Sequence, residues 1–335
     1  MSVGMTRSEA LLAVSAAGRD VRFDLAPLEG VTDFTFRTAL CRFFPGADRC
    51  YSPFIAANQT CSMKTREKKD VAPEHNSGVL LVPQILTNRA DVFVWAAKEM
   101  AERGWTTVNL NLGCPSATVF THGKGAGFLS DPSRLDAFFE SVFETVPDGI
   151  RVSVKTRIGI EDAKEAPALL EVFNRYPLDE LIVHPRLRKD FYKGKPDLDA
   201  YRLFYEGCRG NLTYNGDIFS AADLEALLHV FPRTCRVMIG RGAIRNPAVF
   251  RMLRGGAGPD AGELMRFHDE VLAGRMEDLQ GFANTAGKMK EQWFYMGSLF
   301  EHADRYLKAV KKAGTLEAYR AAVRALFENC RLAAC

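Results

Sequence analysis

The segment RVSVKTRIGIEDAKEAPALLEVFNRYPLDELIVHPR (residues 151–186) contains the clearest structural pattern in the chain. Its two ends, Arg151–Thr156 and Glu180–His184, have the short apolar runs of β-strands, and a helix is expected between them. The second strand includes an uninterrupted Leu-Ile-Val run at residues 181–183. Such runs suit parallel strands that are covered on both faces, so the segment is interpreted as a strand–helix–strand unit.

The same alternation extends in both directions from this unit. Helices are expected to start where Asp131 precedes Pro132 and where Asn246 precedes Pro247, because Asp or Asn caps a helix and proline suits its first position. Strands are expected at Arg22–Pro27, Arg49–Ser52, Val79–Gln84, Thr107–Leu112, Arg151–Thr156, Glu180–His184, Asn211–Asn215 and Arg236–Gly240. Eight strands alternating with helices predict an α/β fold, a (β/α)8 TIM barrel; an open doubly wound sheet is the alternative.

The pattern changes from about residue 261 onward, where no strand is expected. Apolar and aromatic residues recur there at helical spacing in three sets: Leu264, Phe267, His268 and Val271; Met289, Trp293, Met296 and Phe300; Tyr319, Val323 and Leu326. This spacing predicts a C-terminal all-helical bundle whose aromatic residues form a core rather than a platform for stacking bases. We therefore expect a barrel domain over residues 1–255 and a helical domain over residues 256–335.

The composition of the 335 residues, 47% hydrophobic and 25% charged, suits a barrel of roughly 250 residues with a smaller attached unit. No apolar run approaches the ~20 residues of a membrane span, and Ala10–Ala17 is interpreted as a helical lead-in rather than a signal peptide. The eight cysteines form no C-x-x-C pair, so no metal site is expected. Free thiols in a reducing cytoplasm are the simplest interpretation.

Polar and special residues gather at the ends of the expected strands. In a barrel these C-terminal ends meet at one rim, where the reacting groups lie. The relevant stretches are APLEG (26–30), PQ (83–84), NLNLGCPS (109–116), HPR (184–186), NGD (215–217) and GRG (240–242), with Lys155 and Arg157 on the fifth strand. The sequence therefore predicts a pocket at this rim.

The glycines of the last two stretches suit an anion. Gly216, Gly240 and Gly242 allow a close backbone approach, and Arg241 adds charge, in the loops where barrels often hold phosphate. The alternative is that these glycines only form tight turns. Neither stretch follows the G-x-G-x-x-G or Walker pattern, so a Rossmann or P-loop site is not expected.

Lys155 and Cys114 are the candidates for chemistry. Lys155 lies in an apolar strand and needs a partner for its charge, either an anionic reduced flavin ring or a barrel carboxylate. Cys114 lies in a loop at the rim, where a thiol with a pKa near ~8.5 is mostly protonated and can act as an acid. It could equally act as a nucleophile if His184 or His122 favoured its thiolate form.

Six segments resemble the tRNA-dihydrouridine synthases in order and spacing over nearly the whole chain: APLEGVTDFTFR, VNLNLGCPS, SVKTRIG, LIVHPR, YNGDI and MIGRGAIRNP. APLEGV and GCPSATV are most similar to the bacterial C-type subfamily. The resemblance implies an FMN-binding barrel, a helical C-terminal domain that binds tRNA, and NADPH as the reductant. We also expect a cytoplasmic monomer.

Carried over by position, the resemblance implies a role for each residue at the rim. Reduced FMN would deliver hydride to C6 of a uridine while Cys114 protonates C5, and C-type similarity points to uridine 16 of the D-loop. FMN contacts are implied for Pro27, Leu28, Glu29, Gln84, Lys155, His184, Asn215, Gly216, Asp217, Gly240 and Arg241. RNA contacts are expected from Asn111, Arg157, Arg186, Lys189 and Lys193.

Two positions depart from the family pattern. Pro185 stands where glycine or alanine is usual and removes an N–H, and Ala117 stands where many members have lysine. These departures affect the expected flavin and RNA contacts. The alternatives to a tRNA uridine reductase are an FMN-dependent reductase of free pyrimidines, dihydrouridine formation in another RNA, and a non-catalytic RNA-binding role.

Overall fold

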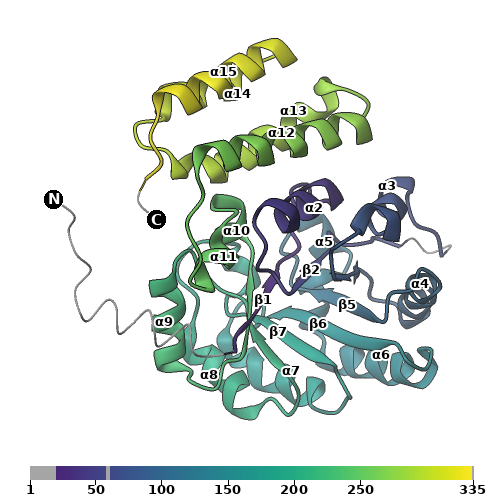
Figure 1. The fold of residues 1–335 in the computed structure, drawn as a ribbon. Helices are drawn as coiled ribbons and strands as arrows, with labels where there is room; N and C mark the ends of the chain where they lie inside the picture. Colours follow the sequence, from purple (N-terminus) through teal and green to yellow (C-terminus); the bar gives the residue numbers. More distant parts are fainter. Residues whose placement is uncertain (1–19, 58–60, 334–335) are drawn as a thin grey trace.

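The computed structural model describes residues 20–57 and 61–333, which form a barrel of parallel strands and a layer of C-terminal helices (Figure 1). The strands are β1 (Arg22–Leu25), β2 (Arg49–Tyr51), β3 (Leu81–Val82), β4 (Gln84–Ile85), β5 (Thr107–Leu112), β6 (Arg151–Arg157), β7 (Glu180–His184), β8 (Leu212–Tyr214) and β9 (Arg236–Ile239). Their order is β3-β2-β1-β9-β8-β7-β6-β5-β4, so the first strand pairs with the last. This cyclic order confirms the TIM barrel and excludes an open doubly wound sheet.

Pro83 divides the expected strand Val79–Gln84 into β3 and β4, which is why nine strands stand where eight were predicted. Proline cannot donate to a β-ladder, so the pairing is interrupted at this residue. β3 pairs with β2, whereas β4 pairs with β5. The chain thus passes through Pro83 from one neighbouring strand to the other, and a bridge between Ile55 and Ile85 helps to close the ring.

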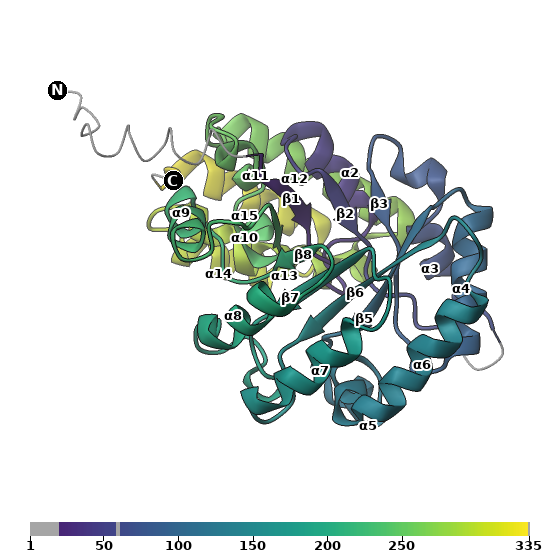
Figure 2. The ribbon, with the colours of Figure 1, turned by 90° about the horizontal axis from the view of Figure 1, so that it is seen from below.

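Helices surround the strands on the outside of the barrel, as Figure 2 shows for α4, α6, α7 and α8. The helices of the barrel are α2 (Phe34–Phe43), α3 (Thr65–Asp70), α4 (Ala90–Glu102), α5 (Ala117–Thr121), α6 (Pro132–Thr145), α7 (Ala166–Phe173), α8 (Leu198–Gly207), α9 (Ala221–Val230), α10 (Arg241–Arg245) and α11 (Val249–Leu253). Short 3-10 turns occur at η1 (Pro73–Asn76), η2 (Gly125–Ser130), η3 (Ala163–Glu165), η4 (Arg188–Asp190) and η5 (Gly297–Leu299).

The two predicted helix starts have different outcomes. Asp131 caps α6 as expected, because its side chain accepts a hydrogen bond from the Arg134 N–H at 3.0 Å. The start predicted at Pro247 is wrong by two residues, since α11 begins at Val249. Asn246 holds the turn before this helix, because its side chain accepts from the Ala248 N–H at 3.0 Å.

The N-terminal end of the barrel is filled by a buried network of charged side chains. Arg49 contacts the carboxylates of Asp24 at 2.6 Å and Glu180 at 2.9 Å, and the Tyr51 hydroxyl donates to Glu180 at 2.6 Å. Both carboxylates are fully buried, and the guanidinium groups of Arg49 and Arg236 compensate their charge. Charged side chains therefore fill this end, whereas the cavity described below lies at the opposite rim.

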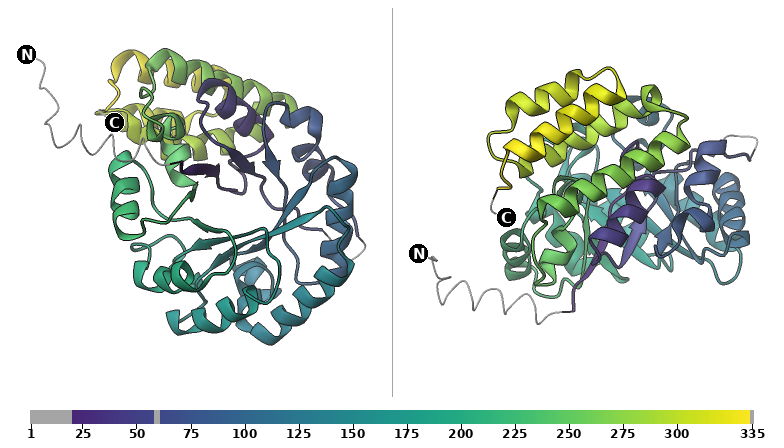
Figure 3. Two further views of the ribbon diagram at one scale, coloured as in Figure 1. Left: turned by 60° about the horizontal axis from the view of Figure 1, so that its bottom comes forward. Right: turned by 45° about the horizontal axis from the view of Figure 1, so that its top comes forward.

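The C-terminal helices are α12 (Ala261–Asp278), α13 (Phe282–Met296), α14 (Asp304–Lys312) and α15 (Leu316–Asn329). They stack over the part of the barrel that carries α2 and α10, with α12 and α13 nearest to it (Figures 1 and 3). The residues predicted to share apolar faces are buried, and the Tyr319 hydroxyl contacts both the Trp293 and His268 ring nitrogens at 2.9 Å. The aromatic residues at these positions form a core, as predicted.

A buried ion-pair cluster joins these helices to the barrel. Asp33, which caps α2, accepts hydrogen bonds from Arg275 of α12 at 3.1 Å and from Lys288 of α13 at 2.8 Å. Arg275 also donates to the Val31 carbonyl and to the Gln292 side chain. Although burial opposes ionisation, the two cations hold the pKa of Asp33 well below its usual range. We call Asp33, Arg275 and Lys288 the interdomain cluster.

Three further expectations concern the N-terminal lead-in, membrane spans and metal sites. The lead-in Ala10–Ala17 lies outside the described residues. Over residues 20–57 and 61–333, no helix is long and apolar enough to cross a membrane. In the same part of the chain, no group of three or more His, Cys, Asp or Glu side chains is arranged to hold a metal ion.

Candidate active site

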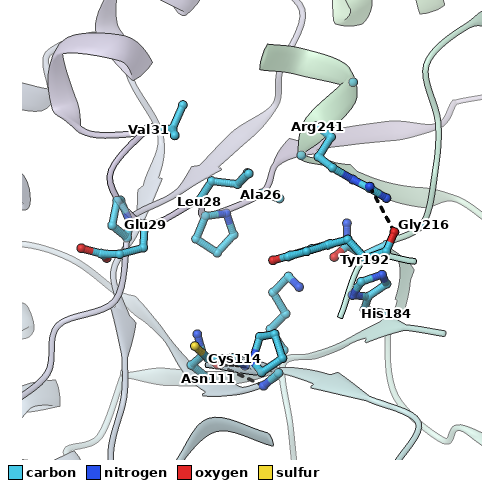
Figure 4. Close-up of a pocket in the computed structure, with 18 of the residues that line it drawn as sticks. Ala26, Leu28, Glu29, Val31, Asn111, Cys114, His184, Tyr192, Gly216 and Arg241 are labelled. Atoms are coloured by element: carbon cyan, nitrogen blue, oxygen red, sulfur yellow. Dashed lines mark hydrogen bonds between the residues drawn. The ribbon is translucent and has the colours of Figure 1, made fainter. Parts of the chain in front are cut away.

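A cavity of about 290 Å³ opens at the C-terminal ends of the strands (Figure 4). The close-up shows Cys114 and Asn111 on one side and His184, Gly216 and Arg241 on another. The cavity wall contains Cys114, Asn111, Arg157 and all residues expected to contact FMN: Pro27, Leu28, Glu29, Gln84, Lys155, His184, Asn215, Gly216, Asp217, Gly240 and Arg241. The fold thus brings together residues that are up to 214 positions apart in the sequence.

A ladder of amide side chains positions the Cys114 loop. The Gln84 side-chain amide donates to Asn109 at 2.8 Å and accepts from Asn111 at 2.7 Å. Asn111 in turn accepts from the backbone N–H groups of Gly113 and Cys114, at 3.0 and 2.9 Å. Asn111 is buried and holds the loop, and it also lines the cavity, so its RNA contact stays a prediction.

Gly125 supports the same loop from behind. Its φ of +56° favours glycine, and a Cβ at this position would lie 2.9 Å from the Cys114 carbonyl oxygen and 3.0 Å from the Cys114 Cβ. The Ala126 N–H donates to the same carbonyl at 3.1 Å. The backbone of Cys114 is therefore fixed from two directions while its side chain faces the cavity.

The environment of Cys114 keeps its thiol protonated. Burial raises the pKa of the thiol, and the Ser116 N–H and the Arg157 charge offset this effect only in part. Neither candidate histidine provides a base. His122 lies outside the cavity wall and contacts the Thr118 carbonyl at 2.7 Å, and His184 is engaged with an arginine. The arrangement therefore favours an acid over a thiolate nucleophile.

His184 is a neutral imidazole of defined tautomer. Burial, followed by the charges of Arg157, Lys155, Arg186 and Arg241, lowers the pKa of His184 well below its usual range. Arg186 Nη1 lies 3.1 Å from His184 Nε2, and since arginine can only donate, Nε2 must accept. The ring proton is thus placed on Nδ1.

Lys155 lies at the cavity wall without a carboxylate partner among the described residues. Burial, and then the charge of Arg157, lowers the pKa of Lys155 to about 7. The alternative of a salt bridge within the barrel is therefore wrong. A buried ammonium without a counter-ion suits an anionic ligand.

Arg157 and Arg186 hold the loop that follows β7. Arg157 donates to the carbonyls of Gly113, Leu187 and Phe191, each at 2.8 Å. Arg186 donates to the carbonyls of Lys193 and Gly194 and pairs with Asp217 at 2.5 Å. Both arginines are about 1% exposed, and Arg157 also lines the cavity. Both side chains thus hold this loop, and their expected RNA contacts stay predictions.

The remaining expected RNA contacts lie outside the cavity wall. Lys189 is exposed and pairs with Glu161 at 3.9 Å, and Lys193 is exposed.

Pro185 and Ala117 are the two positions that depart from the family pattern. Pro185 is buried, and its carbonyl accepts a hydrogen bond from the Asp197 N–H at 2.7 Å. Ala117 is the first residue of α5.

Asp217 acts through two arginines. Its carboxylate pairs with Arg186 and with Arg241, so it orients the Arg241 guanidinium at the cavity wall. A carboxylate would repel a phosphate group, and only the backbone of this residue suits the expected phosphate contact. The Arg241 charge is the cationic feature of this side of the cavity.

The sequence analysis missed several cavity residues, among them Pro53, Phe54 and Phe219 as well as Tyr192, Glu291 and Tyr295. Tyr192, in the loop after β7, lies 5.6 Å from the Arg157 guanidinium and 5.1 Å from that of Arg241, and its ring projects into the cavity in Figure 4. Its position in an aromatic pair after a strand end was an available signal. Glu291 and Tyr295 come from α13, and no local pattern showed that this helix reaches the barrel rim.

Comparisons with known proteins identify the family of the chain. The family model described as dihydrouridine synthase (Dus) matches residues 24–334. The tRNA-dihydrouridine(16) synthase of Cupriavidus necator is 30% identical over 243 residues, covering 70% of this chain and 74% of that protein. The probable tRNA-dihydrouridine synthase of Rhizobium leguminosarum bv. phaseoli is 27% identical over 300 residues, covering 88% and 90%.

A solved structure shares the fold. The histamine dehydrogenase from Rhizobium sp. 4-9 is similar with a TM-score of 0.53 and 12% identity, over 84% of this chain and 51% of that chain. At this identity the likeness concerns the fold alone. The family model, in contrast, spans both the barrel and the C-terminal helices. On this basis, the chain belongs to the dihydrouridine synthase family.

Proposed function

We propose that the protein is an FMN-dependent enzyme that reduces a uridine of tRNA to 5,6-dihydrouridine, with NADPH as the reductant. The observation that carries this proposal is the meeting of a protonated thiol, Cys114, and an unpaired buried ammonium, Lys155, in one cavity. Its family membership and the tRNA-dihydrouridine synthases among its relatives support the substrate.

The cavity suits FMN in two parts. Lys155, Gln84 and the Nδ1–H of His184 offer hydrogen bonds to an isoalloxazine ring, and Leu28 offers an apolar wall. Gly216, Gly240 and Arg241 offer close backbone approach and charge for the phosphate. When bound and reduced, FMN supplies the hydride that adds to C6 of the uracil.

The phosphate side depends on Gly242. A Cβ at this position would lie 2.1 Å from the Ile218 carbonyl oxygen and 2.9 Å from Ile239 Cγ2, so Gly242→Ala must displace the start of α10, which carries Arg241. We expect the variant to bind FMN at least about tenfold more weakly, measured by fluorescence titration of the apoprotein. Gly314→Ala is the control, because nothing lies within 4 Å of that added Cβ. Equal FMN affinity in both variants would place the phosphate elsewhere.

Cys114 completes the reduction. The amide ladder holds the thiol at the cavity, and its raised pKa keeps the proton that C5 of the uracil requires. The thiolate that remains is partly stabilised by the Arg157 charge and the Ser116 N–H. Solvent then restores the proton, since Cys114 is only partly buried.

A uridine in folded RNA must turn out of its stack to reach this cavity, so the target should lie in an unstacked loop. Lys189 and Lys193 are exposed near the cavity loop and suit RNA phosphates. The tRNA-dihydrouridine(16) synthases among the relatives favour uridine 16 of the D-loop as the target.

Lys155 is expected to lower the stability of the apoprotein and to strengthen the binding of FMN. Lys155→Met removes a buried amine that is partly charged near neutral pH and has no counter-ion, so we expect the apoprotein to gain about 1 kcal/mol, or roughly 2–4 °C in Tm. The same change should weaken FMN binding about tenfold or more, because a charge-assisted hydrogen bond is lost. Differential scanning calorimetry and FMN titration measure the two effects. Lys98→Met, on the exposed face of α4, should change neither. A less stable Lys155→Met apoprotein would contradict this explanation.

The function is tested by mapping dihydrouridine in tRNA. tRNA from cells that lack the gene should miss one dihydrouridine, and the purified protein with NADPH should restore it. A complete set of dihydrouridines in those cells would refute the proposal. Rapid NADPH oxidation by free uracil without RNA would favour the free-pyrimidine reductase instead.

A further inference from the structure

One turn of α13, residues 291–295, forms part of the cavity wall at the side of the C-terminal helices. Glu291 and Tyr295 line the cavity and are the only wall residues contributed by the described C-terminal helices. Phe294, next to Tyr295, is 79% exposed, the largest exposed fraction among the large apolar side chains of the described residues. An aromatic ring in water beside a ligand cavity is a candidate contact for the ligand.

This turn is held in place rather than mobile. Lys288, three residues before Glu291, pairs with Asp33 of the barrel at 2.8 Å. The buried Gln292 accepts from Arg275 at 3.1 Å. These contacts thus fix α13 just before the turn and within it, and Phe294 and Glu291 are presented at a defined place on the rim.

Aromatic rings gather at this part of the rim. Phe294 contacts Tyr295 edge to face, with ring centroids 5.1 Å apart and an interplanar angle of 87°. Tyr295 is partly buried at the cavity wall and lies near Tyr192, whose ring projects into the cavity. Stacking on such rings is sequence-tolerant, because every nucleobase has a π-face.

The Glu291 carboxylate adds a specific acceptor. Within residues 20–57 and 61–333, no hydrogen bond or ion pair engages this carboxylate. Its Oε2 would lie 3.7 Å from a Cβ at Gly30, in the loop that follows β1. A carboxylate repels phosphate but accepts N–H donors of a base edge. Glu291 and Phe294 are three residues apart on α13, and this spacing places both side chains on the same side of the helix.

We propose that Phe294 and Glu291 form a subsite for a nucleobase next to the target uridine, which stacks on Phe294 and donates an N–H group to Glu291. The inference rests on the proposed function, because it requires an RNA substrate. Turning one nucleotide out of a loop exposes the faces of its neighbours, and the Phe294 ring replaces the lost stacking. A guanine suits the subsite best, since its N1–H and N2–H groups lie side by side and match the two carboxylate oxygens.

The stacking half is tested with a double-mutant cycle between protein and RNA. Phe294→Ala should raise the KM for tRNA about tenfold with little change in kcat or in bound FMN, and Phe294→Trp should restore the KM. On a tRNA with an abasic nucleotide beside the target uridine, on the 5′ or the 3′ side, Phe294→Ala should have no further effect. An unchanged KM, or an equal loss on intact and abasic tRNA of both kinds, would overturn the stacking role.

The acceptor half is tested by Glu291→Gln, which keeps the shape and removes the charge. We expect the KM to rise for tRNA with a guanine beside the target and to change less for tRNA with an adenine there. An identical response to both bases would refute the role of Glu291. Leu80→Ala is the matched control, since Leu80 is 63% exposed, precedes β3 and lies outside the cavity wall. If the wild-type protein forms no dihydrouridine at all, the proposed function fails first, and the two failures remain distinguishable.

Discussion

Cys114→Ala should retain its FMN and lose about 10²–10⁴-fold in the rate of dihydrouridine formation. The alanine removes only the acid, because the Asn111 side chain binds the backbone N–H of this position rather than its thiol. Hydride addition at C6 without protonation at C5 leaves a carbanion, which is why the loss falls on the chemical step. Rapid-quench measurement of dihydrouridine in a single turnover determines this rate.

Two comparisons make this result specific. Cys208→Ala, at a partly buried thiol outside the cavity wall, should have normal activity. Visible absorbance of the purified Cys114→Ala protein should show the same FMN content as the wild type. Unchanged single-turnover rates in the Cys114→Ala protein would exclude the acid role, whereas loss of FMN would show that the residue instead supports the cofactor.

The second large effect is expected at the interdomain cluster. Asp33→Asn leaves the buried guanidinium of Arg275 and the ammonium of Lys288 without their shared counter-ion, which should cost about 3–5 kcal/mol of unfolding free energy. Asparagine keeps the N-cap of α2, so the loss reports the charge. Urea denaturation followed by circular dichroism measures this change.

The same cluster predicts a pH dependence. The pKa of Asp33 is lowered in the folded state, so its contribution is present above the unfolded pKa of ~3.9 and is lost as the pH falls below it. Asp33→Asn should show less of this acid-induced loss. Glu270→Gln is the control. Its exposed ion pair with Arg42 also joins α12 to α2, and this pair should contribute about 1 kcal/mol or less. Equal stability of Asp33→Asn and the wild type would show that the cluster does not join the domains.

The strands, the rim and most of the cavity residues could be predicted because they depend on local signals. The run at residues 181–183 and the cap at Asp131 are short-range patterns, and barrel topology places every strand end at one rim. The division at Pro83 was also readable in principle, since proline cannot donate to a ladder. The number of strands that results depends on the pairing of β3 with β2 and of β4 with β5, and both partners are distant in sequence.

The roles that the sequence did not show are set by distant partners. Arg157 and Arg186 have the residue type of an RNA contact, and in the fold they also bind carbonyl groups of the loop after β7, with Arg157 binding the Gly113 carbonyl as well. Asn111 was expected at the RNA, and the fold shows that it anchors the Cys114 loop. The helical spacing of α13 identified its core face but not its neighbour, because docking on the barrel depends on Asp33, 255 positions earlier.

Single-turnover oxidation of the reduced protein is the most direct test of the central claim, that a flavin in this barrel transfers hydride to a uridine of RNA. Anaerobically reduced protein would be mixed with tRNA from cells that lack the gene, while visible absorbance and dihydrouridine are followed together. We predict that the flavin is reoxidised with formation of one dihydrouridine per flavin, and far more slowly with free uracil. Reoxidation by uracil as fast as by tRNA, or reoxidation without dihydrouridine, would contradict the account.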